Sequence, residues 1–180
     1  MVYVFLANGF EEIEALAAVD ILRRAEIDLK TVGIGSNIIR GSHDIPVITD
    51  LDSNEIELNE QLEMIVLPGG MPGTFNLEEN SNVQKAIEYC LDNNKYISAI
   101  CAAPSILGHK GILDGKEATC FPGFEKELGQ AVYSSNLVVN DGKITTAKGA
   151  GCAVKFGLKL VELLVSKDKS EALEASLQCK

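Results

Sequence analysis

The feature that most constrains the fold is a regular alternation of short apolar runs with segments of helical periodicity. Strand-like runs occur at Val2–Ala7, Asp28–Gly35, Met64–Leu67 and Tyr96–Ile100. Helical spacing of apolar residues occurs at Glu11–Ala25, Asn80–Asn93, Pro104–His109 and Cys152–Val165. Strands that alternate with helices through short links form parallel sheets covered on both faces. The sequence therefore predicts a flavodoxin-like, Rossmann-like α/β fold: a three-layer sandwich around a mainly parallel sheet.

Two segments outside this alternation are typical of β-hairpins. Asn37–Thr49 carries Gly41-Ser42 in its middle, and we expect it to extend from the main sheet. Val132–Val139 and Lys143–Ala147 are joined by Asn140-Asp141-Gly142, and Asp-Gly is a strong hairpin turn signal. A charged terminal helix is expected from Lys167. The sequence has no repeat or linker, so its 180 residues are interpreted as one domain spanning residues 1–180.

Composition excludes several classes of partner. The formal net charge of −10 disfavours nucleic acid and anionic membranes. No apolar run approaches the roughly 18 residues of a membrane span, and the apolar start lacks the basic flank of a signal peptide. Five cysteines without a C-x-x-C pair predict free thiols and a cytoplasmic location. With only two histidines, we do not expect a metal site of the Cys/His type.

The segment after the strand at Tyr96–Ile100 predicts a reactive cysteine. A nucleophile elbow needs small residues two positions before and after the nucleophile, and Ala99 and Ala103 flank Cys101 in this way. Pro104 suits the first turn of a following helix. Exposed helix amides can lower a thiol pKa from about 8.5 to roughly 3.5–7.5. The alternative is a small buried cysteine at a strand end.

A carboxylate is a better proton-handling partner for Cys101 than either histidine. His109 lies eight residues further along the same helix, roughly 12 Å away at 1.5 Å per residue, and nothing places His43 beside the sulfur. Glu11, Glu12 and Glu14 open the helix that follows the first strand. We expect Glu14 to point inward with a raised pKa, and Glu11 and Glu12 to be solvated. The alternative is that these acids only complement the helix dipole.

Paired glycines at another strand end predict an oxyanion-binding turn. Gly69 and Gly70 follow Pro68, and their amides could act with that of Ala102; the alternative is a simple turn. Gly149-Ala150-Gly151 lacks the third glycine of a dinucleotide loop, so nucleotide binding is disfavoured. Of the remaining cysteines, Cys152 is interpreted as a second, closely packed thiol at a helix start, and Cys90 as a helix-core residue. Cys120 is interpreted as a strand-end thiol and Cys179 as a tail residue.

Together these motifs resemble the ThiJ/PfpI superfamily, in the branch of the parkinsonism-associated deglycase (DJ-one). The resemblance covers roughly residues 2–165 and rests on Ala7–Glu14, Leu67–Gly70 and Ala99–Pro104. It implies a flavodoxin-like homodimer without a cofactor, with Cys101 as the reactive cysteine and Glu14 as its protonated partner. It further implies that the amides of Gly69, Gly70 and Ala102 line the pocket, and that Arg24 reaches the pocket of the partner subunit.

The function implied is cofactor-independent glyoxalase or deglycase chemistry on methylglyoxal-type aldehydes or their adducts. The alternative is an oxidative-stress sensor or chaperone in which Cys101 is oxidised to sulfinate, and a third possibility is an inert scaffold or small-molecule binder. Two positions depart from the family pattern. Phe121 stands where animal members have a histidine near the cysteine, and His43 stands where an arginine often lies near the dimer seam.

Overall fold

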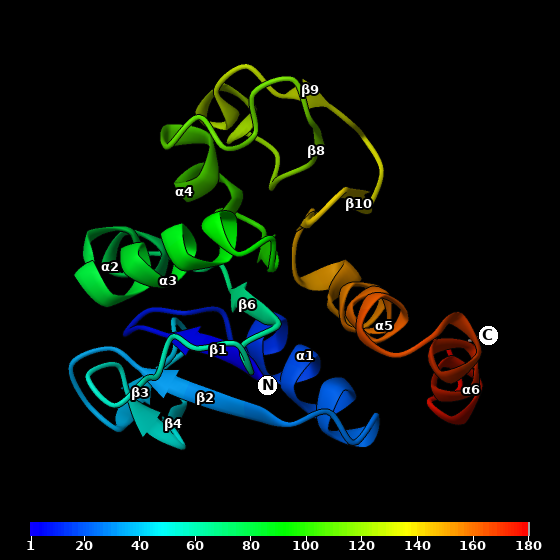
Figure 1. The fold of residues 1–180 in the computed structure, drawn as a ribbon, viewed down its shortest axis with the longest axis horizontal. Helices are drawn as coiled ribbons and strands as arrows, with labels where there is room; N and C mark the ends of the chain where they lie inside the picture. Colours follow the sequence, from blue (N-terminus) through cyan, green and yellow to red (C-terminus); the bar gives the residue numbers. More distant parts are fainter. Residues whose placement is uncertain (180) are drawn as a thin grey trace.

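A parallel sheet forms the centre of the computed structural model, which describes residues 1–179 (Figure 1). Within these residues the main sheet has seven strands in the order β10-β11-β7-β6-β1-β2-β5. Their bounds are β1 Val2–Leu6, β2 Leu29–Gly33, β5 Leu51–Asp52, β6 Met64–Leu67, β7 Tyr96–Ile100, β10 Val138–Asp141 and β11 Ile144–Ala147. Within this sheet, over the described residues, only the β10–β11 pairing is antiparallel. The order β2-β1-β6-β7-β11 is the flavodoxin-like one, and the predicted fold class is confirmed.

Alternate side chains of each strand enter different cores, which explains the uniformly apolar strand sequences. In β1, Val2, Val4 and Leu6 belong to one core cluster. Tyr3 and Phe5 belong to the other. A strand buried on both faces needs apolar residues at every position.

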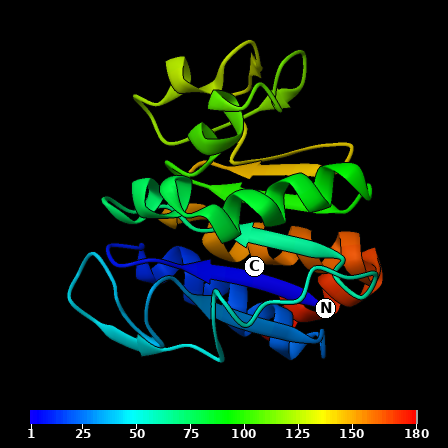
Figure 2. The same cartoon turned by 60° about the vertical axis from the view of Figure 1, so that its left-hand side comes forward.

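Helices cover both faces, as Figure 2 shows. Those that supply the first core lie on one side: α1 Glu12–Arg24, α5 Ala153–Leu164 and α6 Lys167–Ser176. The other side is covered by α3 Ser81–Asp92 and α4 Pro104–His109. A short helix, α2 Gly73–Glu79, precedes α3. The expected helices are therefore present, each within one or two residues of its predicted bounds, whereas α2 was not predicted.

Two hairpin predictions need correction. β3 Ile38–Arg40 and β4 Pro46–Ile48 do pair antiparallel, but as a separate sheet instead of an extension of the main one. The second predicted hairpin starts only at Val138. The residues predicted to begin this hairpin instead form β9 Val132–Tyr133, which pairs in parallel with β8 Glu117–Ala118. Alternating apolarity in 132–139 thus spans two strands separated by a turn.

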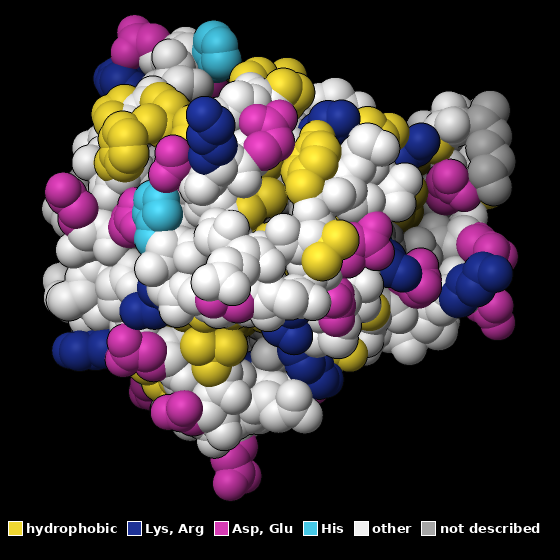
Figure 3. Space-filling model, turned by 90° about the horizontal axis from the view of Figure 1, so that it is seen from above, with side chains coloured by type: hydrophobic (Ala, Val, Ile, Leu, Met, Phe, Trp, Pro, Cys, Tyr) yellow, Lys and Arg dark blue, Asp and Glu magenta, His cyan; other side chains and the backbone are white. Residues whose placement is uncertain are grey.

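The surface carries charges of both signs. Figure 3 shows acidic and basic side chains interspersed with small separate groups of hydrophobic side chains on one face. Among the described helices, none is long and apolar enough to cross a membrane.

Candidate active site

The loop after β7 forms the predicted elbow. Cys101 has φ +65°, in the left-handed region that non-glycine residues rarely occupy. Backbone hydrogen bonds hold the loop: the Cys101 amide donates to the Ala147 carbonyl (2.9 Å), and the Cys101 carbonyl accepts from Phe121 (2.8 Å). The sulfur-bearing residue is half-buried, so the thiol is accessible while its backbone is held.

Glu14 lies against this sulfur. Its residue is only 1% exposed, and its carboxyl is hydrogen-bonded to the Cys101 side chain. The Gly69 amide donates to Glu14 Oε2 at 2.9 Å, and the Ala150 amide also bonds this carboxyl. Glu11 is the N-cap of α1, where its Oε2 accepts from the Glu14 amide at 2.7 Å. The structure thus brings Glu14 and Cys101 together, as the sequence predicts.

The position of this pair follows from the order of the strands. Ligands of open parallel sheets bind beyond the carboxyl ends of the strands, where the strand order reverses. Here the reversal lies between β1 and β6. Glu14 follows β1, Gly69 and Gly70 follow β6, and Cys101 follows the adjacent β7.

Glycine is required in the turn after β6. A Cβ on Gly69 would lie 2.6 Å from Cys101 Cβ and 2.7 Å from Glu14 Oε2. Gly70 has φ +92°, and its amide, like that of Ala102, bonds the sulfur. The sequence assigned both glycine amides to the substrate pocket. In the structure the Gly69 amide instead serves the carboxyl, which leaves Gly70 and Ala102 as the donors at the sulfur.

The electrostatics of the pair correct one expectation. Burial raises the pKa of Glu14 to about 7, and the charge of Glu11 adds to this. Burial and the adjacent Glu14 carboxylate also raise the pKa of the Cys101 thiol, against the lowering effect of the Ala102 and Gly70 amides. The predicted lowering of the thiol pKa by helix amides is therefore wrong, because burial, together with Glu14, outweighs these amides. The helix α4 has only six residues and begins three positions after the sulfur, so its dipole is weak.

Arg24 lies at the other end of α1. It is ten residues from Glu14, roughly 15 Å along the helix axis, and its Nε bonds Asp20 at 2.6 Å. Within one chain Arg24 does not reach the cysteine, and its contact with a partner's pocket stays a prediction.

The acids at the helix start are not all solvated. Glu12 is 5% exposed, which contradicts the predicted exposure. Its Oε1 accepts from the His43 amide at 2.8 Å, and its Oε2 lies 2.9 Å from His43 Nδ1. These bonds lower the pKa of Glu12 against the opposing effect of its burial, and they raise the pKa of His43. Glu11, Glu12 and His43 bring potential metal ligands within 4.8 Å of one another, a grouping the sequence analysis did not anticipate.

His109 is a surface residue, as expected. Its ring nitrogens lie 2.6 Å from Glu78 and 3.0 Å from Glu127, and these bonds raise its pKa. These partners lie outside the cysteine site.

The loop after β11 contains site residues that the sequence reasoning missed. Ala150 bonds Glu14 through its amide, and a Cβ on Gly149 would lie 3.2 Å from Phe121 Cδ2 and 3.8 Å from Glu14 Oε1. The available signal was positional, since β11 ends beside β7. The sequence analysis weighed this loop only as a nucleotide motif.

The other cysteines occupy different environments. Cys90 is buried in α3 and Cys120 is buried beyond β8, and burial raises their pKa values to about 12 and about 11. Cys152 is 3% exposed, and its Sγ donates to the carbonyls of Gly149 (3.1 Å) and Leu137 (3.3 Å). Cys179 is exposed near the end of the chain.

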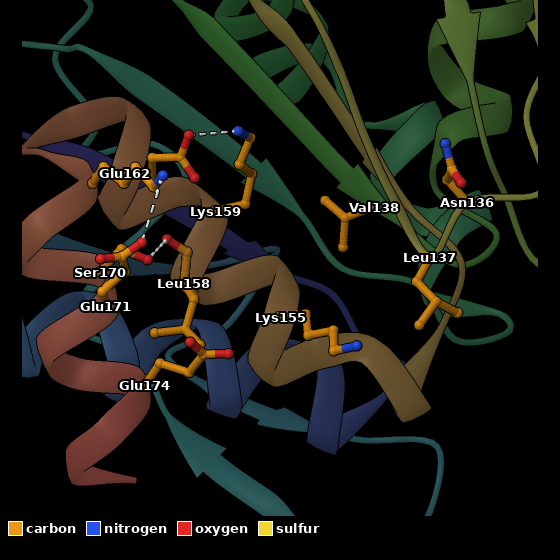
Figure 4. A pocket seen from close by; sticks show the side chains of 11 residues that line it. Asn136, Leu137, Val138, Lys155, Leu158, Lys159, Glu162, Ser170, Glu171 and Glu174 are labelled. Carbon is orange, nitrogen blue, oxygen red and sulfur yellow. Dashed lines mark hydrogen bonds and ion pairs between the residues drawn. The ribbon is translucent and has the colours of Figure 1, made fainter. Parts of the chain in front are cut away.

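The largest described cavity, about 540 Å³, lies away from this site. Figure 4 shows it between α5, α6 and the segment 136–138. Its wall includes the ion pair of Lys159 with Glu162 (2.8 Å) and the Ser170 hydroxyl, which donates to the Leu158 carbonyl (2.8 Å). Each of these polar groups has a hydrogen-bond or ion-pair partner within the wall. Neither Cys101 nor Glu14 lines the cavity.

Fold and site together define a flavodoxin-like α/β protein with a half-buried cysteine paired to a buried carboxyl. The chain belongs to the DJ-1/PfpI family, whose model matches residues 1–163. It is 33% identical to protein dj-1beta of Drosophila melanogaster over 97% of this chain and 94% of that protein. The structure of that relative superposes with a TM-score of 0.93 over 98% of this chain and 96% of the other.

Two further relatives bear on the site. The glutathione-independent glyoxalase DJ-1 of Schizosaccharomyces pombe is 33% identical, over 98% of this chain and 97% of that protein. The structure of oxidized Toxoplasma gondii DJ-1 is 31% identical, with a TM-score of 0.93 and coverage of 98% of this chain and 97% of that one.

Proposed function

We propose that this protein is a cysteine-dependent, cofactor-independent glyoxalase or deglycase that acts on methylglyoxal-type aldehydes or their adducts. The observation that carries the proposal is the hydrogen-bonded pair of a half-buried thiol and a buried carboxyl. The similarity to a relative named as a glutathione-independent glyoxalase supports it.

The reaction begins with the proton that Glu14 and Cys101 share. With the proton on Glu14, the negative charge lies on the sulfur, which faces the amides of Gly70 and Ala102. This arrangement is the nucleophilic form, because thiolate attacks and thiol does not. Burial raises the pKa of Glu14 to about 7, so this carboxyl is partly protonated at physiological pH and can hold the proton that the sulfur gives up.

The sulfur of Cys101 then adds to the aldehyde carbon of methylglyoxal and forms a hemithioacetal. Glu14 protonates the new oxygen, and its carboxylate next carries the hydrogen of the former aldehyde carbon to the ketone carbon. The hydroxyl proton of the hemithioacetal moves to the ketone oxygen in the same isomerisation, which leaves a thioester carbonyl beside a new hydroxyl. The aldehyde carbon is oxidised and the ketone carbon reduced, so no external oxidant is required. Water hydrolyses the resulting thioester to lactate and frees the thiol. The amides of Gly70 and Ala102 stabilise the oxyanions that form along this path.

Loss of methylglyoxal without glutathione tests the proposal. We expect Cys101→Ser and Glu14→Gln each to lower kcat/KM by about 10²–10⁴-fold, the range for loss of a nucleophile or a general acid–base group. Cys179→Ser is the matched control, because this thiol is exposed near the chain end. Equal rates in all four proteins would overturn the proposal.

An oxidative sensor at the same sulfur is the second candidate. Hydrogen peroxide would convert the thiolate to sulfenate with release of water, and a second peroxide would give sulfinate with release of another water. The half-buried sulfur, the two amide donors and the neighbouring acid favour this outcome at Cys101 over the buried cysteines.

We further propose that the protein acts as a cytoplasmic homodimer, with a small-molecule aldehyde as its partner in the pocket. Isoleucines exposed by half or more on the first turn of α1 and on the β3–β4 sheet support a second copy as the cover of this surface. They are Ile13, Ile38 and Ile48.

A further inference from the structure

A second cavity borders the cysteine site. It has a volume of about 360 Å³, and its wall is mainly apolar. Its lining includes Phe121, Pro122, Leu137, Gly149, Ala150 and Cys152. Phe121 is 47% exposed and Leu137 is 46% exposed, so two large apolar side chains face solvent beside one hollow.

The cavity shares its wall with the reacting groups. The Phe121 amide donates to the Cys101 carbonyl (2.8 Å), and the Ala150 amide bonds the Glu14 carboxyl. The Gly149 Cβ position lies 3.2 Å from the Phe121 ring and 3.8 Å from Glu14 Oε1. A side chain at Gly149 would therefore press against the Phe121 ring and reach the Glu14 carboxyl, so this glycine joins the cavity wall to the cysteine site.

The wall offers little to a polar group. Phe121, Pro122 and Leu137 have no side-chain hydrogen-bonding atoms, and the Cys152 sulfur donates to backbone carbonyls. The charged residue of the wall is Lys148, whose Nζ donates to the Ser135 carbonyl at 3.4 Å. A polar substituent placed there would lose water without gaining a partner, whereas an apolar substituent gains from leaving water.

We propose that this cavity is a subsite for the apolar substituent of the aldehyde, and that Phe121 determines specificity. The inference rests on the proposed function and narrows its substrate class to α-oxoaldehydes with an aryl or large alkyl group on the ketone carbon. Phenylglyoxal would react with the same redox balance as methylglyoxal. The aldehyde carbon is oxidised, the ketone carbon is reduced, and water releases mandelate from the Cys101 thioester.

The test compares kcat/KM for phenylglyoxal and methylglyoxal. We expect the wild type to favour phenylglyoxal by about tenfold or more, since filling an apolar pocket with a few extra carbons gives about 10–200-fold discrimination. Phe121→Asn and Leu137→Asn should each remove most of this preference, because kcat/KM for phenylglyoxal falls much further than kcat/KM for methylglyoxal. Phe75→Asn is the matched control, because Phe75 is similarly exposed on α2 outside this cavity.

A second readout does not require turnover. Cys101 alkylation by N-benzyl-iodoacetamide and by iodoacetamide is followed by peptide mass spectrometry, and each rate is divided by that of free N-acetylcysteine. A preference for the benzyl reagent that is lost in Phe121→Asn and Leu137→Asn supports the subsite. If the wild type shows this preference but consumes no aldehyde, the subsite stands and only the proposed function is overturned. Methylglyoxal turnover with no aryl preference, or an alkylation preference unchanged in both variants, overturns the subsite.

Discussion

Cys101 and Cys152 occupy equivalent places in neighbouring loops but face opposite hydrogen-bonding partners. Each follows a strand of the same parallel pair, β7 or β11, and each precedes a helix. The Cys101 sulfur receives bonds from the amides of Gly70 and Ala102, whereas the Cys152 sulfur donates to the carbonyls of Gly149 and Leu137. Donors stabilise a sulfur anion, while carbonyl acceptors stabilise the protonated thiol.

Exposure strengthens this contrast. Cys101 is half-buried at a left-handed elbow, and Cys152 is 3% exposed inside a short 3₁₀ turn. Position at a strand end is therefore insufficient to make a cysteine reactive. We expect solvent access, together with amide donors that partly offset the effect of burial on the Cys101 pKa, to distinguish the two thiols.

The largest expected effect is selective modification of Cys101. We expect iodoacetamide at pH 7.5 to alkylate Cys101 about a thousandfold faster than Cys152, because Cys152 is 3% exposed and must first be opened to solvent. Hydrogen peroxide should follow the same order and add two oxygens at Cys101 first. Isotope-coded labelling with peptide mass spectrometry measures each rate. Comparable rates at the two thiols would remove the contrast.

The next effect concerns the charge beside Cys101, which has no counterpart at Cys152. The Glu14 pKa is raised from 4.5 to about 7, so the folded state binds more protons than the unfolded state between these values. Stability is therefore lost as pH rises from about 4.5 through 7, by at most about 3 kcal/mol. Urea unfolding of wild type and Glu14→Gln at pH 5 and pH 8 measures this loss.

The comparison with Glu14→Gln separates this group from the histidines. The raised pKa values of His43 and His109 also lower stability as pH rises, but they do so in both proteins. We expect the free energy of unfolding of Glu14→Gln to rise relative to that of wild type between pH 5 and pH 8. If the difference in unfolding free energy between the two proteins were constant across this range, the pKa of Glu14 would not be raised to about 7.

Sequence reasoning succeeded where one local rule determined the outcome. The small residues around Cys101 require the elbow, and continuous apolar runs require strands buried on both faces. It failed where distant segments meet. The burial of Glu12 depends on the β3–β4 sheet folding over it, and the role of Ala150 depends on β11 lying beside β7. Neither pairing leaves a local pattern in the sequence.

The thiol pKa shows the same limit in energetic terms. The amides that lower this pKa belong to Ala102, beside Cys101, and to Gly70, and the sequence placed both at the pocket. The opposing contributions come from burial and from the charge of Glu14, which is 87 positions away in the chain. Only the packed structure shows which contribution is larger.

The smallest effect tests the structural side of the comparison. If Cys152 serves as a hydrogen-bond donor, Cys152→Ser keeps an O–H that can reach the Gly149 carbonyl, whereas Cys152→Ala leaves the carbonyls of Gly149 and Leu137 without this donor. We expect the alanine variant to lose about 1 kcal/mol of unfolding free energy relative to the serine variant. Urea denaturation of the two variants provides the measurement. An alanine variant as stable as the serine variant would mean that Cys152 contributes packing alone, and the contrast with Cys101 would then rest on exposure instead of hydrogen-bond direction.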